Sequence, residues 1–221
     1  MSKHILKVLE VGIVTHNVRR FVLEKPEGFE YVPGQATEIA INKTGLDSLF
    51  RPFTFTSIPS SDFLEFIIKI YVGHDGMTEK LASIKKGDEL IINDVFGAIH
   101  YKGAGLFIAA GAGITPFISI FRQLSEDNDL PGNCLLFANQ TSDDIILGEE
   151  LFKLLGEDYE NVIEYDKVSG TGARINREML KQKLSLKTQY CYICGPVRFT
   201  ETMFEYLTEL GVMKSNIVVE Q

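Results

Sequence analysis

The segment Arg51-Pro52-Phe53-Thr54 places a cation, an aromatic ring and a hydroxyl on one short extended stretch. An arginine fork can bind a diphosphate, an aromatic ring can pack on a flat heterocycle, and a threonine hydroxyl can donate to a ring nitrogen. Strand side chains alternate between faces, so twist must bring these groups toward one ligand. The combination favours a ligand with a diphosphate and a planar ring, whereas each residue alone is more typical of an ordinary barrel strand.

A glycine turn follows an apolar stretch at residues 109–117, which read AAGAGITPF. Gly111 and Gly113 allow backbone to approach a ligand closely, Thr115 is a predicted helix cap, and Pro116 suits the first helical position. A helix that begins here would present its N-terminus to an anion or a dipolar ring. The turn is not a phosphate-binding loop of an NTPase, because no Lys-Ser or Lys-Thr pair follows.

A second such corner lies at Cys194-Gly195-Pro196, after another apolar stretch. The carboxyl ends of parallel strands share one edge of a sheet, so this corner and the 111–116 turn can converge on one ligand. Cys191 and Cys194 form a CxxC pair, but strand positions three apart point to opposite faces, so no metal site is predicted. A buried, inert Cys194 is the alternative to a functional one.

A third candidate is the segment Gly76-Met77-Thr78, at the start of a short predicted helix over residues 78–84. Thr78 is the predicted N-cap of that helix. Backbone N–H groups at a helix start can donate to phosphate oxygens. These residues could therefore contact the same diphosphate as Arg51.

The elements that must position these residues differ between the two halves of the chain. In the first half, short β-branched or aromatic stretches are separated by Gly, Pro, Asn and Asp turns, which predicts an antiparallel β-barrel over residues 1–100. The expected strands are 4–14, 19–26, 36–41, 51–57, 63–72 and 88–94.

In the second half, apolar strands alternate with amphipathic helices, which predicts an α/β domain with a parallel sheet over residues 101–221. The expected strands are 105–110, 134–140, 162–168 and 190–195, and the expected helices are 115–124, 146–155, 176–184 and 199–210. The fold class predicted is therefore two-domain, a barrel followed by a parallel α/β sheet. No flexible linker separates the halves, so the two domains are expected to abut.

Composition excludes several functional classes. The chain has 221 residues, and 22 basic against 30 acidic residues give a formal charge of -8 at pH 7, which argues against a general nucleic-acid binder. The N-terminus alternates polar and apolar residues and lacks an export signal. The apolar run 105–121 is shorter than the roughly 20 residues of a bilayer span. We therefore predict a cytoplasmic protein without a membrane span.

Taken in order, these motifs resemble the ferredoxin-NADP reductase superfamily over nearly the whole chain. Residues 134–147 and the Ile68-Lys69-Ile70-Tyr71 segment are most similar to its NADH-dependent cytochrome b5 reductase and nitrate reductase branch. The resemblance implies an N-terminal flavin domain, a C-terminal pyridine-nucleotide domain and two cofactors, FAD and NADH (or NADPH). It implies hydride transfer between rings stacked in contact, so that positioning supplies most of the catalysis.

The resemblance also assigns roles to matching residues. Arg51 would neutralise the FAD pyrophosphate, Phe53 would pack on the flavin, and Thr54 would hydrogen-bond the hydride-accepting nitrogen. The implied catalytic residues are Thr54, Cys194 and Glu220. The implied FAD-binding residues are Arg51, Pro52, Phe53, Thr54, Ile67, Lys69, Tyr71, Gly76, Met77, Thr78 and Thr115. The implied NAD(P)H-binding residues are Gly111, Gly113, Thr115, Pro116, Gln140, Thr141, Asp166, Cys194, Gly195 and Pro196.

Nucleotide preference is predicted from the acid at the end of the third α/β strand. Asp166 resembles the NADH-selecting position of the cytochrome reductase branch, where a carboxylate repels the extra phosphate of NADPH. Lys167 and Arg174 lie nearby in the sequence and leave NADPH as the alternative.

The electron acceptor is expected to be a separate protein, a ferredoxin, a flavodoxin or a cytochrome, because the chain has no cysteine set for an iron-sulfur cluster. Such partners are often acidic, and Arg19-Arg20, Lys80 and Lys85-Lys86 are candidates for a basic docking patch, unless they are ordinary solvated charges. A monomer is favoured. The alternatives are a free-flavin or quinone reductase, and an electron-transfer subunit of a larger complex.

Overall fold

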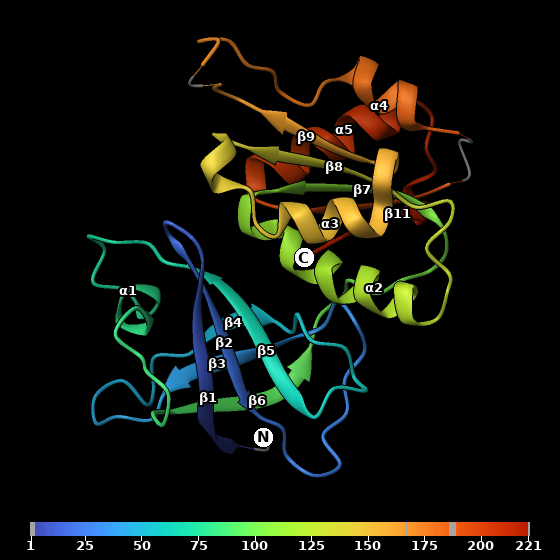
Figure 1. Cartoon of the computed structure of the whole chain (residues 1–221). Coiled ribbons are helices and arrows are strands. Elements are labelled where there is room, and N and C mark those ends of the chain that lie inside the picture. The colour runs from blue at the N-terminus through green and yellow to red at the C-terminus, as the bar shows by residue number, and fades with distance from the viewer. Residues whose placement is uncertain (1–2, 167, 186–188, 221) are drawn as a thin grey trace.

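The computed structural model describes residues 3–166, 168–185 and 189–220, and it contains two sheets that lie one above the other (Figure 1). The first half of the chain forms a six-stranded antiparallel sheet and the second half forms a five-stranded parallel sheet. The predicted fold class, an antiparallel barrel followed by a parallel α/β sheet, is confirmed. Among the described residues, no helix is long and apolar enough to span a bilayer.

The six-stranded sheet has the order β4-β3-β6-β1-β2-β5. Its strands are β1 (His4–Thr15), β2 (Val18–Glu24), β3 (Ala36–Ile41), β4 (Arg51–Thr54), β5 (Phe63–Lys69) and β6 (Glu89–Phe96). The two edge strands meet where the Thr56 N–H donates to the Glu65 carbonyl at 2.8 Å, which closes the sheet toward a barrel. Alternating apolar residues fill the interior, with the rings of Phe21, Phe55 and Phe66 fully buried there.

A short helix, α1 (Met77–Leu81), lies beside the barrel (Figure 1). The prediction that Thr78 caps it is wrong, because the N-cap is Gly76 and no side chain caps the helix. Instead the Glu79 carboxylate accepts the N–H groups of Gly73, His74 and Asp75, and so holds the preceding loop. These bonds are the first cause of the lowered pKa of Glu79.

The parallel sheet has the order β11-β10-β7-β8-β9. Its strands are β7 (Gly105–Ala110), β8 (Cys134–Asn139), β9 (Tyr159–Ile163), β10 (Tyr190–Cys194) and β11 (Ile217–Val219). The α-helices between them are α2 (Thr115–Glu126), α3 (Gly148–Leu155), α4 (Arg177–Lys183) and α5 (Val197–Glu209). The 3-10 turns in the described part of the chain are η1 (Gly111–Ile114), η2 (Ser142–Asp144), η3 (Gly156–Asp158) and η4 (Lys214–Asn216). The sequence did not predict β11.

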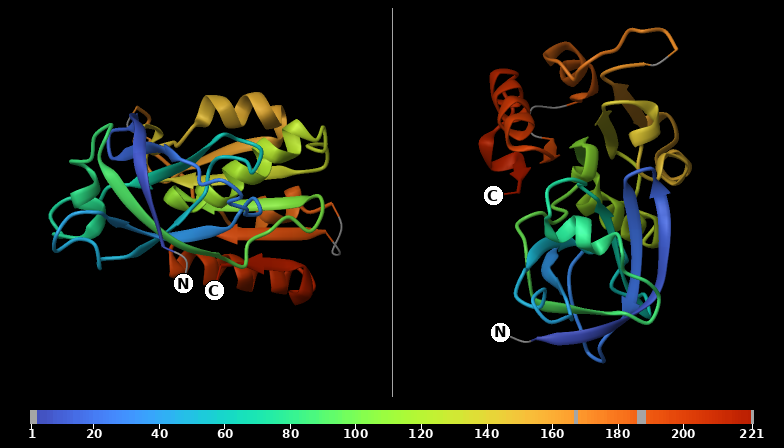
Figure 2. Two further views of the ribbon diagram at one scale, coloured as in Figure 1. Left: turned by 90° about the horizontal axis from the view of Figure 1, so that it is seen from below. Right: turned by 90° about the vertical axis from the view of Figure 1, so that its left-hand side faces the viewer.

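Helices cover the parallel sheet on both faces (Figure 2, left). One face packs Phe107, Leu135 and Phe137 against α2 and α3, and the other packs Leu106 and Leu136 against α4 and α5. Burial on both faces explains why these strands are continuous apolar runs. The same alternation puts Cys194 in the first of these clusters and Cys191 in the second, as the strand spacing predicted.

The barrel and the parallel sheet share a packed interface. The barrel residues Val18, Ile67 and Ile99 belong to the same buried cluster as the apolar face of α2. The Gly34 N–H donates to Ser119 Oγ of α2 at 3.0 Å, and a Cβ at Gly34 would lie 2.5 Å from the Ile99 carbonyl oxygen. Only glycine fits this close approach. The boundary at residue 100 stays a proposal, within the link between β6 and β7.

Candidate active site

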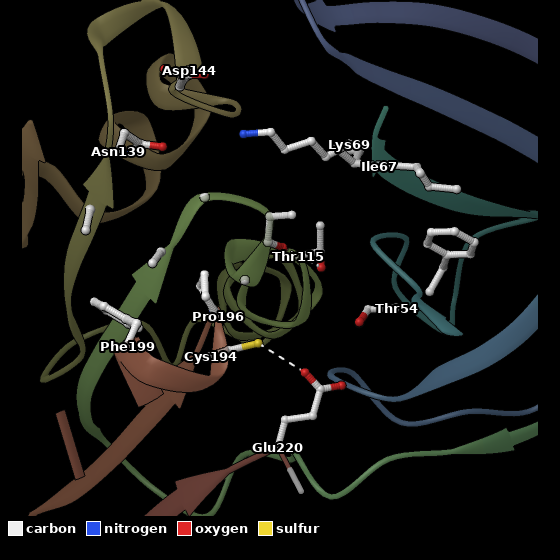
Figure 3. Close-up of a pocket in the computed structure, with 18 of the residues that line it drawn as sticks. Thr54, Ile67, Lys69, Thr115, Asn139, Asp144, Cys194, Pro196, Phe199 and Glu220 are labelled. Carbon is white, nitrogen blue, oxygen red and sulfur yellow. Dashed lines mark hydrogen bonds between the residues drawn. The ribbon is translucent and has the colours of Figure 1, made fainter. Parts of the chain in front are cut away.

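A cleft of about 900 Å³ lies between the barrel and the carboxyl edge of the parallel sheet. The barrel contributes β4 and β5 to its walls, and the parallel sheet contributes the ends of β7, β8 and β10 (Figure 3). Its volume is near the upper end of the roughly 300–1,000 Å³ typical of cofactor and ligand sites. Its location also fits a binding site, because open α/β sheets normally bind ligands at the carboxyl edge, where strand ends and helix N-termini meet.

The barrel wall presents Phe53, Thr54 and Ile67, all of which line the cleft. Figure 3 shows the Lys69 side chain extending across the cleft toward Asn139 and Asp144 on the opposite wall. A lysine ammonium in this position can neutralise a phosphate that bridges the two walls.

The first corner of the opposite wall is η1 followed directly by α2. Thr115 does not cap α2 as predicted, because the 3-10 turn runs straight into the helix, and its Oγ1 donates to the Ala112 carbonyl at 3.0 Å instead. Pro116 occupies the first turn of α2, as predicted, but it is buried and does not line the cleft. Gly111 has a φ of +53°, which favours glycine.

The second corner is the link between β10 and α5, and it packs tightly against the first. A Cβ at Gly113 would lie 2.3 Å from the carbonyl oxygen of Cys194, and a Cβ at Gly195 would lie 2.9 Å from the Phe199 ring. Both corners therefore need glycine so that their backbones can pack against each other, and together they form a glycine cradle whose backbone lines the cleft. Phe199 contributes a ring to this part of the cleft (Figure 3).

Cys194 and Glu220 form a polar pair at the end of the cleft nearest the C-terminus. The Cys194 Sγ donates to Glu220 Oε2 at 3.3 Å (Figure 3). Burial, together with the charge and acceptor of Glu220, raises the pKa of the Cys194 thiol well above its ordinary value of 9.0. At neutral pH the thiol is protonated, so it is suited to donating a hydrogen bond and not to nucleophilic attack.

Most of the residues predicted from the sequence lie together at this cleft. Those that line it are Pro52, Phe53, Thr54, Ile67, Lys69, Tyr71, Thr78, Gly111, Gly113, Thr115, Gln140, Cys194, Gly195, Pro196 and Glu220. Segments far apart in the sequence thus converge on one site.

Six predicted residues do not line the cleft, and their roles stay predictions. Arg51 is exposed and its Nη1 donates to the neighbouring Phe50 carbonyl at 2.7 Å. Met77 is buried in the barrel core, and Gly76 precedes it as the N-cap of α1. Pro116 is buried in the first turn of α2, as described above.

The other two, Thr141 and Asp166, lie at the outer end of the nucleotide side. Thr141 lines a smaller adjoining pocket of about 510 Å³, where its side chain donates to Asp144 Oδ2 at 2.7 Å. Asp166 Oδ1 accepts the N–H groups of Val168 and Ser169, which lower its pKa and hold its own turn. Lys167 lies outside the described residues.

Several lining residues were not predicted from the sequence, including Phe96, Asn139, Glu164 and Phe199. Asn139 was the most accessible to prediction, because it ends a strand and directly precedes the predicted Gln140. Glu164 and Asp144 add two carboxylates to the outer wall of the cleft.

The residues present fit a pair of dinucleotide cofactors. Gly111, Gly113 and Gly195 present backbone rather than side chains to the cleft. Lys69 offers a cation for phosphate, and the Asn139 amide is buried without a partner among the described residues. Each of these features is what a bound nucleotide would complete.

Comparison with known proteins agrees with this assignment of the two halves. Residues 5–101 match the family described as oxidoreductase FAD-binding domain, and residues 107–204 match the oxidoreductase NAD-binding domain. An NADH-cytochrome b5 reductase 1 of Coccidioides immitis is 29% identical over 230 residues, which cover 93% of this chain and 74% of that protein. Three mammalian proteins of the same name are 30% identical, and this chain spans 61% of their length.

Solved structures of related proteins share the fold. The CS-b5R domains of human Ncb5or, in the NAD+ form, superimpose with a TM-score of 0.85 and 26% identity, covering 100% of this chain and 70% of that one. A ferredoxin NADP+ reductase from Neisseria gonorrhoeae with bound FAD and NADP gives a TM-score of 0.84 at 20% identity, covering 100% and 98%. The chain therefore belongs to the ferredoxin-NADP reductase superfamily of flavin-dependent oxidoreductases that use FAD and a nicotinamide nucleotide, near its cytochrome b5 reductase branch.

Proposed function

We propose that this chain oxidises NADH through FAD bound in the cleft and passes the electrons to a separate haem protein. The observation that carries the proposal is that Thr54 from the barrel and the Cys194–Glu220 pair from the parallel sheet line the same cleft. The relatives named NADH-cytochrome b5 reductase support a haem acceptor. Ferredoxin and flavodoxin are the other acceptor classes to be tested.

FAD, when bound, supplies the chemistry by accepting a hydride from NADH and releasing electrons to the acceptor. The protein would hold the flavin and nicotinamide rings in the geometry for hydride transfer. Thr54 would offer a hydroxyl to the flavin from the barrel side, and Thr115 would meet the flavin from the start of α2. The protonated Cys194 thiol, held by Glu220, would border the nicotinamide.

NADH is favoured over NADPH because acidic side chains gather at the outer wall of the cleft. Asp144 and Glu164 line the wall, and Asp166 follows β9 nearby. Arg174 is paired with Glu164 at 3.1 Å, so the repulsion of a 2′-phosphate would come mainly from Asp144 and Asp166. The ratio of kcat/KM for NADH to that for NADPH tests this preference, and a ratio below one would contradict it.

The predicted basic patch for docking contains fewer available charges than the sequence suggested. Arg20 is paired with Glu10 and Glu65, and Lys80 is paired with Asp75. Lys85 and Lys86 are exposed and lie next to each other beyond α1. We therefore propose Lys85 and Lys86 as the part of this patch that would meet an acidic partner.

Purification and an acceptor comparison test the proposal. The protein is expected to retain FAD through gel filtration and to reduce cytochrome b5 with NADH faster than it reduces ferredoxin or flavodoxin. A colourless protein that consumes added free flavin as a substrate would contradict the proposal and favour a free-flavin reductase. Failure to reduce any of the three acceptors, despite rapid flavin reduction, would contradict the acceptor assignment.

A further inference from the structure

Two buried asparagines lie at opposite ends of β8, and their surroundings differ. Asn133 precedes the strand and is 1% exposed, and Asn139 ends it and is 4% exposed. Asn133 is fully engaged, because its Oδ1 accepts from the Gly105 N–H at 3.1 Å and its Nδ2 donates to the Leu130 carbonyl at 3.0 Å. The protein backbone therefore provides hydrogen-bond partners for both ends of the Asn133 amide.

Asn139 has no such partners. Among the described residues, neither its Oδ1 nor its Nδ2 makes a hydrogen bond, although both atoms are buried. Buried amides in folded proteins are nearly always paired, so an amide with both ends free needs an explanation. The preceding β8 residues Leu135, Leu136 and Phe137 belong to buried apolar clusters, and replacing the Asn139 amide by an apolar side chain would break no hydrogen bond among the described residues.

The position of Asn139 supplies the explanation. Its side chain lines the cleft and points toward Lys69 on the opposite wall (Figure 3). The ammonium group of Lys69 can hold a diphosphate between the two walls, and the group covalently attached to each end of a dinucleotide's diphosphate is a ribose. A ribose hydroxyl donates and accepts at once, as a free amide with one donor group and one acceptor requires.

We propose that Asn139 is a nucleotide-binding residue whose buried amide is completed by a ribose hydroxyl of the nicotinamide dinucleotide and not by the protein. This inference rests on the proposed function. Binding would require only that the amide rotate enough to expose its buried Oδ1 and Nδ2 atoms to the ribose, and its terminal torsion is broad and rotates at little cost. The unliganded protein then carries an unpaired amide, and the nucleotide removes this defect when it binds.

The proposal predicts opposite behaviour for the two asparagines. Asn139→Leu, in the FAD-loaded protein, is expected to keep or raise the Tm measured without nucleotide, and to weaken NAD+ binding about tenfold or more by calorimetry. Asn133→Leu is expected to lower the Tm and to leave NAD+ affinity within about twofold, because it breaks bonds within the fold and lies away from the cleft. NAD+ avoids turnover, so that affinity is measured without chemistry.

AMP and nicotinamide mononucleotide distinguish the two riboses. Weakened binding of AMP alone by Asn139→Leu would assign the contact to the adenosine ribose, and weakened binding of nicotinamide mononucleotide alone would assign it to the nicotinamide ribose. Either result supports the proposal, and unchanged affinity for both overturns it. Asn139→Ala, which adds no branched side chain, should show the same loss of affinity if Asn139→Leu does not fold.

Two outcomes separate this inference from the function on which it rests. If the wild-type protein binds no NAD+, the proposed function fails. If the wild-type protein binds NAD+ and Asn139→Leu binds it equally well, only the role of Asn139 is wrong. A loss of Tm in Asn139→Leu as large as that in Asn133→Leu would also overturn it, because the amide would then be structural.

Discussion

Arg122 on α2 donates from Nη1 to Oε1 of Glu65 on β5 at 2.6 Å, so an ion pair joins the helical layer of the parallel sheet to the barrel. Glu65 is 3% exposed, and Arg20 and Thr56 also donate to its carboxylate. Arg122 in turn binds both carboxylate oxygens of Glu150 on α3 and the Thr56 carbonyl. Because Thr56 lies just beyond β4, this network fixes the barrel strand that carries Thr54 relative to α2, which begins at Thr115.

Removing one partner of this network should destabilise the protein. Arg122→Met leaves the buried Glu65 carboxylate without its main counter-charge, and we expect a loss of about 3 kcal/mol in the free energy of unfolding. That value is at the lower end for a buried pair, because Arg20 still faces Glu65. Denaturant unfolding of the FAD-loaded protein measures it.

The matched control is an ion pair between two exposed side chains. Arg177 and Glu209 join α4 to α5, and both side chains are more than half exposed. Arg177→Met is expected to cost less than about 1 kcal/mol. Equal losses for Arg122→Met and Arg177→Met would mean that burial of the first pair has no energetic consequence.

Acid should weaken the same network. Burial alone would raise the pKa of Glu65, but the charge of Arg122 and hydrogen bonds from Arg122, Arg20 and Thr56 outweigh it and lower the pKa below 4.5. A lowered pKa in the folded state means that this stabilisation is complete above the unfolded pKa and is lost as pH falls through the folded value. The free energy of unfolding should therefore fall below about pH 5, and less steeply in Glu65→Gln than in the wild type.

The glycine cradle should not tolerate a methyl group. In Gly113→Ala the new Cβ would meet the Cys194 carbonyl oxygen at 2.3 Å, and backbone cannot give way as a side chain can. We expect a loss of about 1–3 kcal/mol in stability and weaker NAD+ binding, because the two corners must separate. Gly12→Ala is the control, since its nearest neighbour is Arg20 Cβ at 3.8 Å. Unchanged NAD+ affinity in Gly113→Ala would contradict a role of the glycine cradle in NAD+ binding.

The Cys194 thiol should alkylate slowly at neutral pH, because burial and Glu220 raise its pKa well above 9.0. Glu220→Gln removes the negative charge, so the pKa should fall and the rate of iodoacetamide labelling at pH 8 should rise. Cys191 is an internal control, because burial raises its pKa to about 12 and Glu220 is not among the causes. Mass spectrometry resolves the two sites, and an equal change at both would show that the variant has only loosened the fold.

The sequence predicted the fold well where its signal is local and repeated. Alternating strands predicted the barrel, and apolar runs between amphipathic helices predicted the parallel sheet. It missed β11, because three residues, Ile217–Val219, are too few to show a period. It misplaced the cap of α1, because Thr78 has the right chemistry for a cap but the backbone enters the helix at Gly76.

The site was predicted in part, for a similar reason. Short motifs at strand ends identified Thr54, Gly113 and Cys194 as residues that converge, and the structure brings all three to one cleft. The Arg122–Glu65 pair could not be predicted, because an arginine within an apolar helix does not reveal a partner from a distant strand. The unpaired amide of Asn139 could not be predicted either, because it depends on which polar groups the tertiary structure places around the side chain.

The sharpest test of NADH oxidation through FAD is anaerobic mixing of the FAD-loaded protein with NADH, followed by flavin absorbance. We expect rapid loss of the flavin absorbance with NADH and a slower loss with NADPH. We also expect reduction about tenfold slower in Thr54→Val with the FAD content unchanged, since one hydrogen bond of about 1.4 kcal/mol would be lost. Flavin that stays oxidised in the presence of excess NADH would show that the chain does not oxidise NADH through FAD.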